Sequence, residues 1–464
     1  ISHPDAGKTT LTEKFLLYGG AINLAGSVKG KKTAKHAVSD WMEIEKQRGI
    51  SVTSSVMQFE YDGYCVNILD TPGHEDFSED TYRTLMAADS AVMVIDASKG
   101  VEKQTIKLFK VCVLRHIPIF TFINKMDRQS KDPFELLDNI ESILGISTCP
   151  MNWPIGSGKE FKGVYDRGTK EVNMFTAEMN GQKEVNTWNV PIDDPTIDDQ
   201  IGDYFREKLE EDMELLEGAG SEFDLDEVRA GNLTPVFFGS ALTNFGVETF
   251  LQHFLKMTES PASRESNLRV IEPEEEDFSA FVFKIQANMN KAHRDRIAFI
   301  RIVSGEFDAG MEAWHVQSNK KVKLSQPTQI MASERQIVDK AYAGDIIGIF
   351  DPGTFAIGDT LCSSKDKFAF EGIPIFPPEH FARVKQLDTM KRKQFVKGIT
   401  QIAQEGAVQI FQEYITGMEE IIVGAVGTLQ FDVLKFRLAS EYNVDIGLEQ
   451  LPYEYIRYIS NQDE

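Results

Sequence analysis

The chain has 464 residues, which is too long for a single compact core, so we expect about three or four domains. Its formal net charge of −23 argues against a protein that binds bare nucleic acid through an overall basic surface. Any contact with RNA then requires local basic patches or a protein partner, and we expect neither DNA nor a membrane as a partner. No apolar run approaches the roughly 20 residues of a membrane span. We expect a monomer in the cytoplasm.

The cysteines support an intracellular protein. Cys65, Cys112, Cys149 and Cys362 are scattered without a Cys-x-x-Cys pair, and the first two fall in apolar stretches. This usage is typical of reduced thiols in a cytosolic protein. We therefore predict that the four cysteines are core residues.

The chain opens on a pattern for phosphate binding. Gly7, Lys8 and Thr9 form the triplet found where a phosphate-binding loop turns into a helix. In such a loop backbone N–H groups face the α- and β-phosphates, the lysine reaches the β- and γ-phosphate oxygens, and the hydroxyl binds Mg²⁺. Ser2 replaces the first glycine of the usual pattern, and only Ile1 remains of the strand expected before the loop, so we expect the sequence to begin inside a strand. The nucleotide-binding residues predicted here are Ser2, His3, Pro4, Asp5, Ala6, Gly7, Lys8, Thr9 and Thr10.

A second motif follows the apolar strand from Val66 to Asp70 and reads Asp-Thr-Pro-Gly-His. In an Asp-x-x-Gly turn the aspartate holds Mg²⁺, usually through water, and the glycine N–H can meet the γ-phosphate. The nucleotide-binding residues predicted here are Asp70, Thr71, Pro72, Gly73 and His74.

Two further motifs follow strands and point to guanine. Asn124-Lys125-Met126-Asp127 ends a buried strand, at the edge where open α/β sheets bind ligands. A carboxylate there accepts hydrogen bonds from the N1–H and amine of guanine, a donor pair that adenine lacks. Ser240-Ala241-Leu242 follows the strand that begins at Thr234, and this pattern commonly gives a backbone N–H to guanine O6. The four motifs in this order predict a guanine-nucleotide site.

The spacing of the motifs indicates an insert. Residues 1–145 alternate apolar strands, such as Ala91 to Asp96, with amphipathic segments, which predicts a parallel βα sheet. Asn124 and Ser240 lie much farther apart than the about 30 residues that one βα unit needs. We expect an insert at about 146–232, with strands near 161–165 and 171–175 and an acidic helix near 204–216. We interpret it as a surface elaboration rather than a second active site.

Two domains are predicted after the nucleotide-binding one, which we place at 1–258. Residues 259–277 are polar and contain proline, as expected of a linker. Short strands separated by Gly and Asp turns favour a β-barrel over 278–375. Residues 376–464 suggest a βαββαβ-like domain that is incomplete at its C-terminal end. The predicted fold class is an α/β P-loop GTPase domain with an inserted subdomain, followed by an antiparallel β-barrel domain and an α+β ferredoxin-like domain.

These motifs and the domain order resemble the translational GTPases over nearly the whole chain. Within that superfamily, Ser39 to Ser51, Asn152 to Tyr165 and Phe283 to Arg296 are similar to the bacterial peptide chain release factor 3 family. The resemblance implies a ribosome-stimulated GTPase that removes stop-codon-reading release factors after the peptide has been freed. It implies GTP or GDP and Mg²⁺ as cofactors, and the ribosome, through its RNA, and those release factors as partners.

The resemblance also assigns the metal ligands and the catalytic residue. Ser51 stands where the superfamily has a threonine that binds Mg²⁺ when the segment called switch I becomes ordered; it keeps the hydroxyl but lacks the methyl group that limits rotation. The metal ligands are then Thr9, Ser51 and Asp70. His74 is the catalytic residue, which holds the attacking water. From sequence alone, His74 could equally cap or pack against the helix expected from Glu75 to Thr84.

Three other positions take roles from the resemblance. Pro4 and Ile50 stand where the superfamily has apolar gate residues, and we interpret Arg48 as an anchor of switch I or a contact to ribosomal RNA rather than an arginine finger. Two alternative functions stay open: a translocase-like or ribosome-protection GTPase, and a nucleotide-gated ribosome-binding protein with little turnover.

Overall fold

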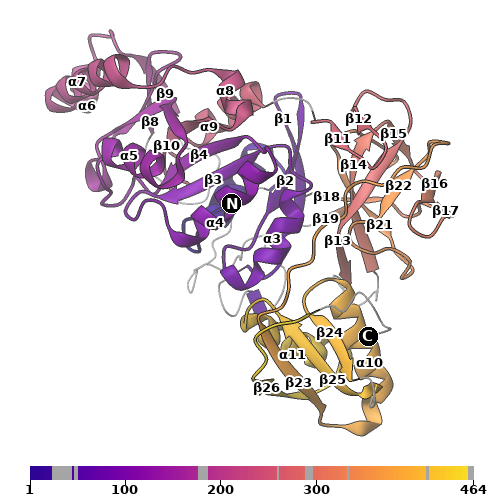
Figure 1. Cartoon of the computed structure of the whole chain (residues 1–464). Coiled ribbons are helices and arrows are strands. Elements are labelled where there is room, and N and C mark those ends of the chain that lie inside the picture. The colour runs from indigo at the N-terminus through magenta and orange to yellow at the C-terminus, as the bar shows by residue number, and fades with distance from the viewer. Residues whose placement is uncertain are drawn as a thin grey trace.

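The structure is a computed structural model that describes residues 1–22, 44–45, 51–175, 187–258, 261–287, 296–331, 334–413 and 417–457. Figure 1 shows three parts: an α/β domain, a β-rich domain beside it, and a small α+β domain below both. Within the described residues, no helix has the length and apolar character required to cross a membrane.

A parallel sheet forms the centre of the α/β domain. Its strands are β3 (Ala91–Asp96), β4 (Ile119–Asn124), β10 (Leu233–Phe238) and β5 (Ser147–Pro150), in that order. β4 and β10 are buried along their whole length, as expected of strands covered on both faces. Ser2 forms a parallel bridge with Val94, so the first residues lie along the edge of β3.

Helices cover both faces of this sheet. One apolar cluster joins it to α4 (Lys103–Leu114) and α5 (Pro133–Leu144), and another joins it to α1 (Lys8–Tyr18) and α9 (Val247–Met257). Phe250 of α9 packs on Phe122 and Phe237 with ring centroids 5.4 and 5.0 Å apart. Aromatic side chains of this size contribute much of the buried apolar area that holds helix and sheet together.

The expected parallel pairing does not extend to the strand before Asp70. β1 (Ser55–Tyr61) and β2 (Tyr64–Asp70) form an antiparallel hairpin, and Gln58 of β1 pairs with Met331 of β18 (Thr328–Met331) in the β-rich domain. The cause is local. Asp62 and Gly63 both have positive φ, 49° and 80°, as a two-residue hairpin turn requires, and the Asp-Gly pair is a strong signal for that turn.

The segment between β5 and α8 (Leu225–Ala230) builds its own sheet. β6 (Asn152–Ile155), β7 (Gly163–Asp166), β8 (Glu171–Phe175) and β9 (Thr187–Pro191) pair antiparallel, followed by α6 (Ile197–Ile201) and α7 (Asp203–Ala219). The predicted strands and acidic helix of this segment are confirmed. β5 itself, at the start of the expected insert, belongs to the main sheet. The indole N–H of Trp153 donates to Asp212 at 2.9 Å and so joins β6 to α7.

The β-rich domain is antiparallel apart from its contact with β1. β13 (Ser279–Ala287) and β14 (Arg296–Ser304) are buried throughout and pair with β22 (Thr360–Cys362) and β21 (Ile346–Phe350), respectively. The remaining strands of this domain are β16 (Glu312–His315), β17 (Lys320–Lys323), β18, β19 (Glu334–Ile337) and the pair β15 (Glu306–Asp308) and β20 (Lys340–Tyr342). The predicted linker contains a two-stranded sheet of its own, β11 (Arg264–Glu265) and β12 (Val270–Ile271), and Ile271 packs in an apolar cluster with side chains of the β-rich domain.

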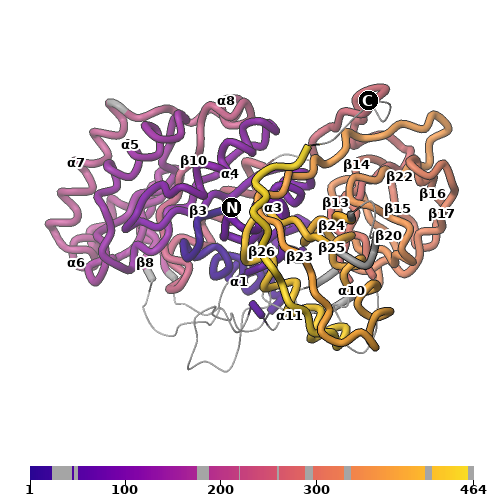
Figure 2. The backbone as a smooth tube through the Cα atoms, turned by 60° about the horizontal axis from the view of Figure 1, so that its bottom comes forward, coloured from indigo at the N-terminus to yellow at the C-terminus, as the bar shows by residue number. Residues whose placement is uncertain are grey.

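The α+β domain has the predicted βαββαβ order. It runs β23 (His380–Gln386), α10 (Arg392–Gln404), β24 (Gln409–Glu413), β25 (Gly417–Ala425), α11 (Leu429–Tyr442) and β26 (Ile446–Leu451), with the antiparallel strand order β24-β25-β23-β26. A single apolar cluster lies between both helices and the sheet. In Figure 2, where the bottom of Figure 1 comes forward, this domain lies in front of the other two. It contacts α3 (Ser78–Leu85) of the α/β domain, where Arg83 donates to the carbonyl of Gly406 at 3.2 Å.

Candidate nucleotide site

The predicted phosphate loop ends at the start of α1. Gly7 has φ 99°, and a Cβ at this position would lie 2.2 Å from Nδ2 of Asn124, so both conformation and space require glycine. The next residue, Lys8, begins the helix, whose first backbone N–H groups have no partner within the helix. This terminus is therefore suited to a phosphate group.

Lys8 and Asp70 bring the first two motifs together. The ammonium group of Lys8 lies 2.5 Å from Oδ1 of Asp70, and both side chains are largely buried. The other oxygen, Oδ2, is buried and has no hydrogen-bond partner among the residues that the structure describes, and Thr9 is also buried. A buried carboxylate oxygen left unpaired is costly and is suited to a cation or its bound water.

The Asp-x-x-Gly turn packs directly on the phosphate loop. A Cβ at Gly73 would lie 3.2 Å from both N and Cα of Pro4, which is closer than most Cβ contacts. The hydroxyl of Thr81 in α3 donates to the carbonyl of Pro72 at 3.2 Å and ties the turn to that helix. The two loops that the sequence predicts around the phosphates are thus in contact.

The residues predicted to read the base form a connected set. Asn124 donates from Nδ2 to the carbonyl of Ala6 and accepts at Oδ1 from the N–H of Ala241, each at 2.8 Å. The hydroxyl of Ser240 donates to Oδ1 of Asp127 at 2.6 Å. Asn124 therefore joins the phosphate loop to the two base-side motifs, while Ser240 holds the carboxylate of Asp127.

Met126 and Leu242, both predicted to bind the nucleotide, lie outside this hydrogen-bonded set. The side chain of Met126 is fully buried and packs in the apolar cluster that joins the sheet to α4 and α5. Leu242 is 40% exposed, whereas its neighbours Ser240 and Ala241 are buried.

Asp96 is a site residue that the sequence reasoning missed. Lys125 donates to its Oδ2 and to the carbonyl of Asp5, each at 2.6 Å. Burial acts to raise the pKa of Asp96, but hydrogen bonds from Lys125 and Ser98 hold it below its usual range. The signal was available, because Asp96 ends β3 at the same sheet edge as Asn124 ends β4.

His74 begins a helical turn beside this site. Its Nδ1 lies 3.3 Å from the backbone N of Asp76, so the ring caps the 3₁₀ turn η1 (Glu75–Phe77) that precedes α3. The alternative expected from the sequence, a capping residue, is therefore observed. Capping uses Nδ1 alone, and the side chain is 36% exposed, so capping does not exclude a catalytic role.

Part of the predicted site lies outside the described residues. Arg48 and Ile50 belong to this part, and Ser51 is the first described residue after it. Among the residues described, no group of three or more His, Cys, Asp or Glu side chains is arranged to hold a metal ion. A cation here would depend on hydroxyl and phosphate oxygens beside the single carboxylate of Asp70.

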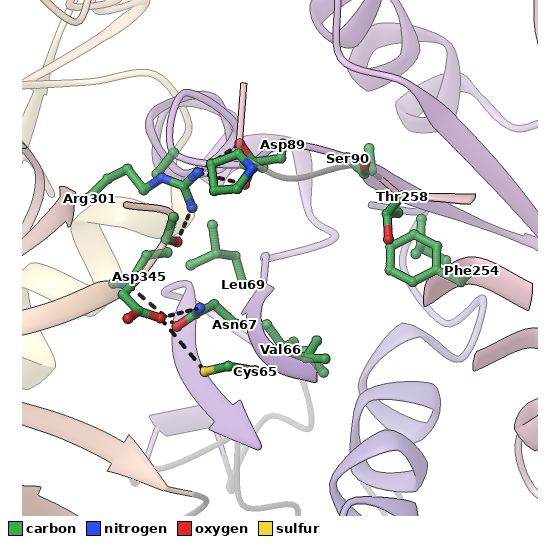
Figure 3. A pocket seen from close by; sticks show the side chains of 18 of the residues that line it. Cys65, Val66, Asn67, Leu69, Asp89, Ser90, Phe254, Thr258, Arg301 and Asp345 are labelled. Carbon is green, nitrogen blue, oxygen red and sulfur yellow. Dashed lines mark hydrogen bonds and ion pairs between the residues drawn. The ribbon is translucent and has the colours of Figure 1, made fainter. Parts of the chain in front are cut away.

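A cavity of about 1150 Å³ lies beside this site, between β2, α9 and the barrel (Figure 3). Lys8 and Asp70 are among its lining residues, but none of the base-side residues is. Arg301 pairs with Asp89 across the domain boundary, and Asn67 donates to Asp345 at 3.3 Å. The cavity is therefore distinct from the space next to Asp127.

Cys65 differs from its prediction. It lies beside Asp345 and is exposed, whereas Cys112, Cys149 and Cys362 are buried as predicted. Cys65 is the second residue of β2, directly after the hairpin turn, so the start of the strand lies outside the core although its sequence is apolar.

Family models match all three parts of the chain. The elongation factor Tu GTP binding domain matches residues 1–260, elongation factor G domain 2 matches 277–364, and the C-terminal domain of class II release factor RF3 matches 370–464. A solved structure from Thermus thermophilus superposes with a TM-score of 0.77 at 21% identity, over 97% of this chain. This chain spans 66% of that chain's length, and the likeness concerns the fold alone.

Curated relatives match the chain from end to end. The peptide chain release factor 3 of Symbiobacterium thermophilum is 61% identical over 462 residues, covering 100% of this chain and 87% of the relative. That of Gloeobacter violaceus is 55% identical over 460 residues, covering 99% and 86%. The chain belongs to the peptide chain release factor 3 family of translational GTPases.

Proposed function

We propose that the chain hydrolyses GTP on the ribosome and thereby promotes the departure of stop-codon-reading release factors after peptide release. The observation that carries the proposal is the meeting of the phosphate-side pair Lys8–Asp70 and the base-side pair Asp127–Ser240 at one sheet edge, linked by Asn124. A guanine nucleotide fits between an anion-binding helix start and a carboxylate acceptor.

The proposed nucleotide contacts follow from the positions of the four motifs. The start of α1 and Lys8 bind the phosphates, Asp127 accepts from guanine, and the segment at Ser240 to Leu242 lies beside the base. Thr9, Ser51 and Asp70 would hold Mg²⁺, which neutralises phosphate charge when bound. The buried unpaired oxygen of Asp70 supports this assignment.

Hydrolysis needs a water held in line with the phosphate as well as charge neutralisation. His74 follows the Gly73 turn that packs on the phosphate loop, and its side chain remains partly exposed. We propose that it positions this water once the ribosome is bound. The family pattern assigns the same role to this histidine.

The proposal extends to the organisation of the protein. We propose a monomer that acts in the cytoplasm, with the nucleotide domain at 1–258, a linker at 259–277, the barrel domain at 278–375 and the α+β domain at 376–464. The separate apolar clusters of the barrel and of the α+β domain support this division. The test must distinguish this role in termination from the alternative, a translocase-like role.

The test follows a fluorescently labelled stop-codon-reading release factor on termination complexes whose peptide has been hydrolysed. GTP should speed its departure, whereas GDP and the His74→Ala variant should not. Phosphate release from GTP, measured with and without ribosomes, should rise when ribosomes are present. Unaltered departure in every case, together with GTP-dependent movement of tRNA and message, would replace the proposal with the translocase-like alternative.

A further inference from the structure

Asp76 contacts the proposed catalytic histidine and another domain at the same time. Its Oδ1 lies 3.2 Å from Nδ1 of His74, and its Oδ2 accepts a hydrogen bond of 2.7 Å from the backbone N–H of Leu429. The side chain is only 13% exposed. One carboxylate thus joins the turn after the Asp-x-x-Gly motif to the first residue of α11 in the α+β domain.

The start of α11 takes its cap from Asp76. Thr428, at the N-cap position of this helix, makes no side-chain capping hydrogen bond. The first N–H groups of a helix need acceptors from outside it, and a negative charge there is favoured by the helix dipole. Asp76 supplies both the hydrogen-bond acceptor and the negative charge. The α+β domain in turn holds the side chain of Asp76 in place through the N–H of Leu429.

Gly427 gives an independent sign that the approach is specified. A Cβ at this position would lie 2.2 Å from Cγ and 2.5 Å from Cα of Asp76. Side chain and backbone of Asp76 both occupy the space that any larger residue would need. The two domains can meet in this way only because residue 427 is a glycine.

The contact restrains one nitrogen of His74. Nδ1 faces both the carboxylate and the backbone N–H of Asp76, at 3.2 and 3.3 Å. With its proton on Nε2 the ring accepts from the N–H, and with a proton on Nδ1 it donates to the carboxylate. In either state Asp76 engages Nδ1 and leaves Nε2 for another partner, which is how an orienting group acts on a catalytic base.

We propose that Asp76 is a positioning residue for His74, and that the α+β domain sets the orientation of the histidine through the start of α11. This inference rests on the proposed role of His74 in hydrolysis. It gives the α+β domain a defined effect on the reaction, although none of its residues belongs to the nucleotide motifs. If α11 shifts relative to η1, the contact between Asp76 and Nδ1 of His74 changes, and with it the orientation of the imidazole. The residues that contact the nucleotide keep their positions.

The test uses the full chain with Gly427→Ala and Asp76→Ala, and Gly447→Ala as a matched control. Gly447 lies in β26 of the same domain, where a Cβ would meet nothing closer than 3.7 Å. We expect both test variants to lower the kcat of ribosome-stimulated GTP hydrolysis by roughly tenfold, since a misplaced catalytic group acts in the transition state. The Kd for GDP should be unchanged, and the control should behave as the native protein.

The decisive measurement repeats both changes in a His74→Ala background. If Asp76 acts through His74, neither change should lower kcat further once the imidazole is absent. Equal losses with and without His74 would overturn the inference and assign Asp76 a structural role. If Asp76→Ala and Gly427→Ala each hydrolyse GTP normally while His74→Ala is inactive, the inference about Asp76 is wrong. The proposed catalytic role of His74 would still hold. If His74→Ala itself hydrolyses GTP normally, the proposed catalytic role fails and the inference fails with it.

Discussion

The hydroxyl of Ser240 donates a hydrogen bond of 2.6 Å to Oδ1 of Asp127, although the two residues belong to motifs far apart in the chain. They come together because each motif follows the carboxyl end of a strand, and these strands, β4 and β10, are parallel neighbours. The bond holds a carboxylate acceptor in a fixed position at the sheet edge. It therefore preorganises the group that we propose to read guanine.

Asp127→Asn should change the base preference. An amide presents a donor where the carboxylate presented an acceptor, so guanine loses a match while xanthine gains one. We expect GTP and GDP affinity to fall by roughly 100-fold, the scale set by losing hydrogen bonds to a charged group. Competition binding with guanine, xanthine and adenine nucleotides measures this. Asp138→Asn, an exposed change on α5, is the control. Displacement of GDP by ATP from the native protein, as effective as by GTP, would remove the guanine assignment.

His74→Ala should leave nucleotide affinity nearly intact and lower ribosome-stimulated hydrolysis by roughly 100-fold or more, because a group that acts only on the attacking water contributes in the transition state. The ring also caps η1, so a stability loss of about 1 kcal/mol is expected as well. His74→Asn separates the two roles. It keeps a capping acceptor, so it should retain stability and still lose hydrolysis. Normal hydrolysis by an unstable His74→Ala protein would leave only the capping role.

The nucleotide motifs could be predicted because each lies at a strand end, where spacing and strand direction determine position. The antiparallel course of β2 could also have been predicted, since the Asp62-Gly63 turn is readable in the sequence, but the apolar run after it was interpreted as part of the βα repeat. The contact between Asp76 and Leu429 could not. It joins residues of separate domains, and its existence depends on how those domains pack rather than on any local pattern.

Lys284→Met should remove hydrogen bonds that hold the segment after Ser51 in place. Lys284 of β13 donates to Oγ1 of Thr53 at 2.7 Å and to the carbonyl of Ser54, and burial lowers its pKa. Methionine fills the space but leaves these oxygens unpaired, at a cost of about 1–3 kcal/mol. We expect weaker binding of a non-hydrolysable GTP analogue, with GDP binding less affected, because only the former uses Ser51 in the proposed site.

Equilibrium binding of both nucleotides to the Lys284→Met variant checks this expectation. Lys320→Met, in the exposed strand β17, is the control and should behave as the native protein. An equal loss for the two nucleotides would show that Lys284 supports the domain interface without acting on the Ser51 segment.

Arg437→Met should destabilise the α+β domain. Arg437 donates to both carboxylate oxygens of Glu405, at 3.0 and 3.1 Å, and to Glu441 at 2.6 and 3.0 Å, and all three side chains are largely buried. Removing the shared cation leaves two carboxylates buried together, which costs about 3–5 kcal/mol. The urea midpoint followed by circular dichroism should fall. Adding Glu405→Gln and Glu441→Gln should recover much of it; no recovery would show that packing of the arginine, rather than its charge, matters.

Lys14→Met should stabilise the protein at neutral pH. Lys14 lies on α1 with 2% of its surface exposed, and no described residue offers its buried ammonium group a hydrogen bond. Burial lowers its pKa from 10.5 to about 8, while Glu13 acts in the opposite direction. At pH 7 the native protein therefore carries a buried charge that the unfolded chain keeps in water. Methionine has a similar length and no charge, so we expect a gain of roughly 1–3 kcal/mol.

The pH dependence tests the cause of that gain. Because the folded pKa lies below the unfolded one, between pH about 8 and 10.5 the unfolded chain binds more protons, and the native protein gains stability relative to the variant as pH rises. The advantage of Lys14→Met should thus be largest below pH 8 and shrink across this window. Urea unfolding of both proteins from pH 7 to 10.5 measures it, with Lys256→Met on exposed α9 surface as the control. A difference that does not vary with pH would mean that side-chain packing, and not the buried charge, sets the effect.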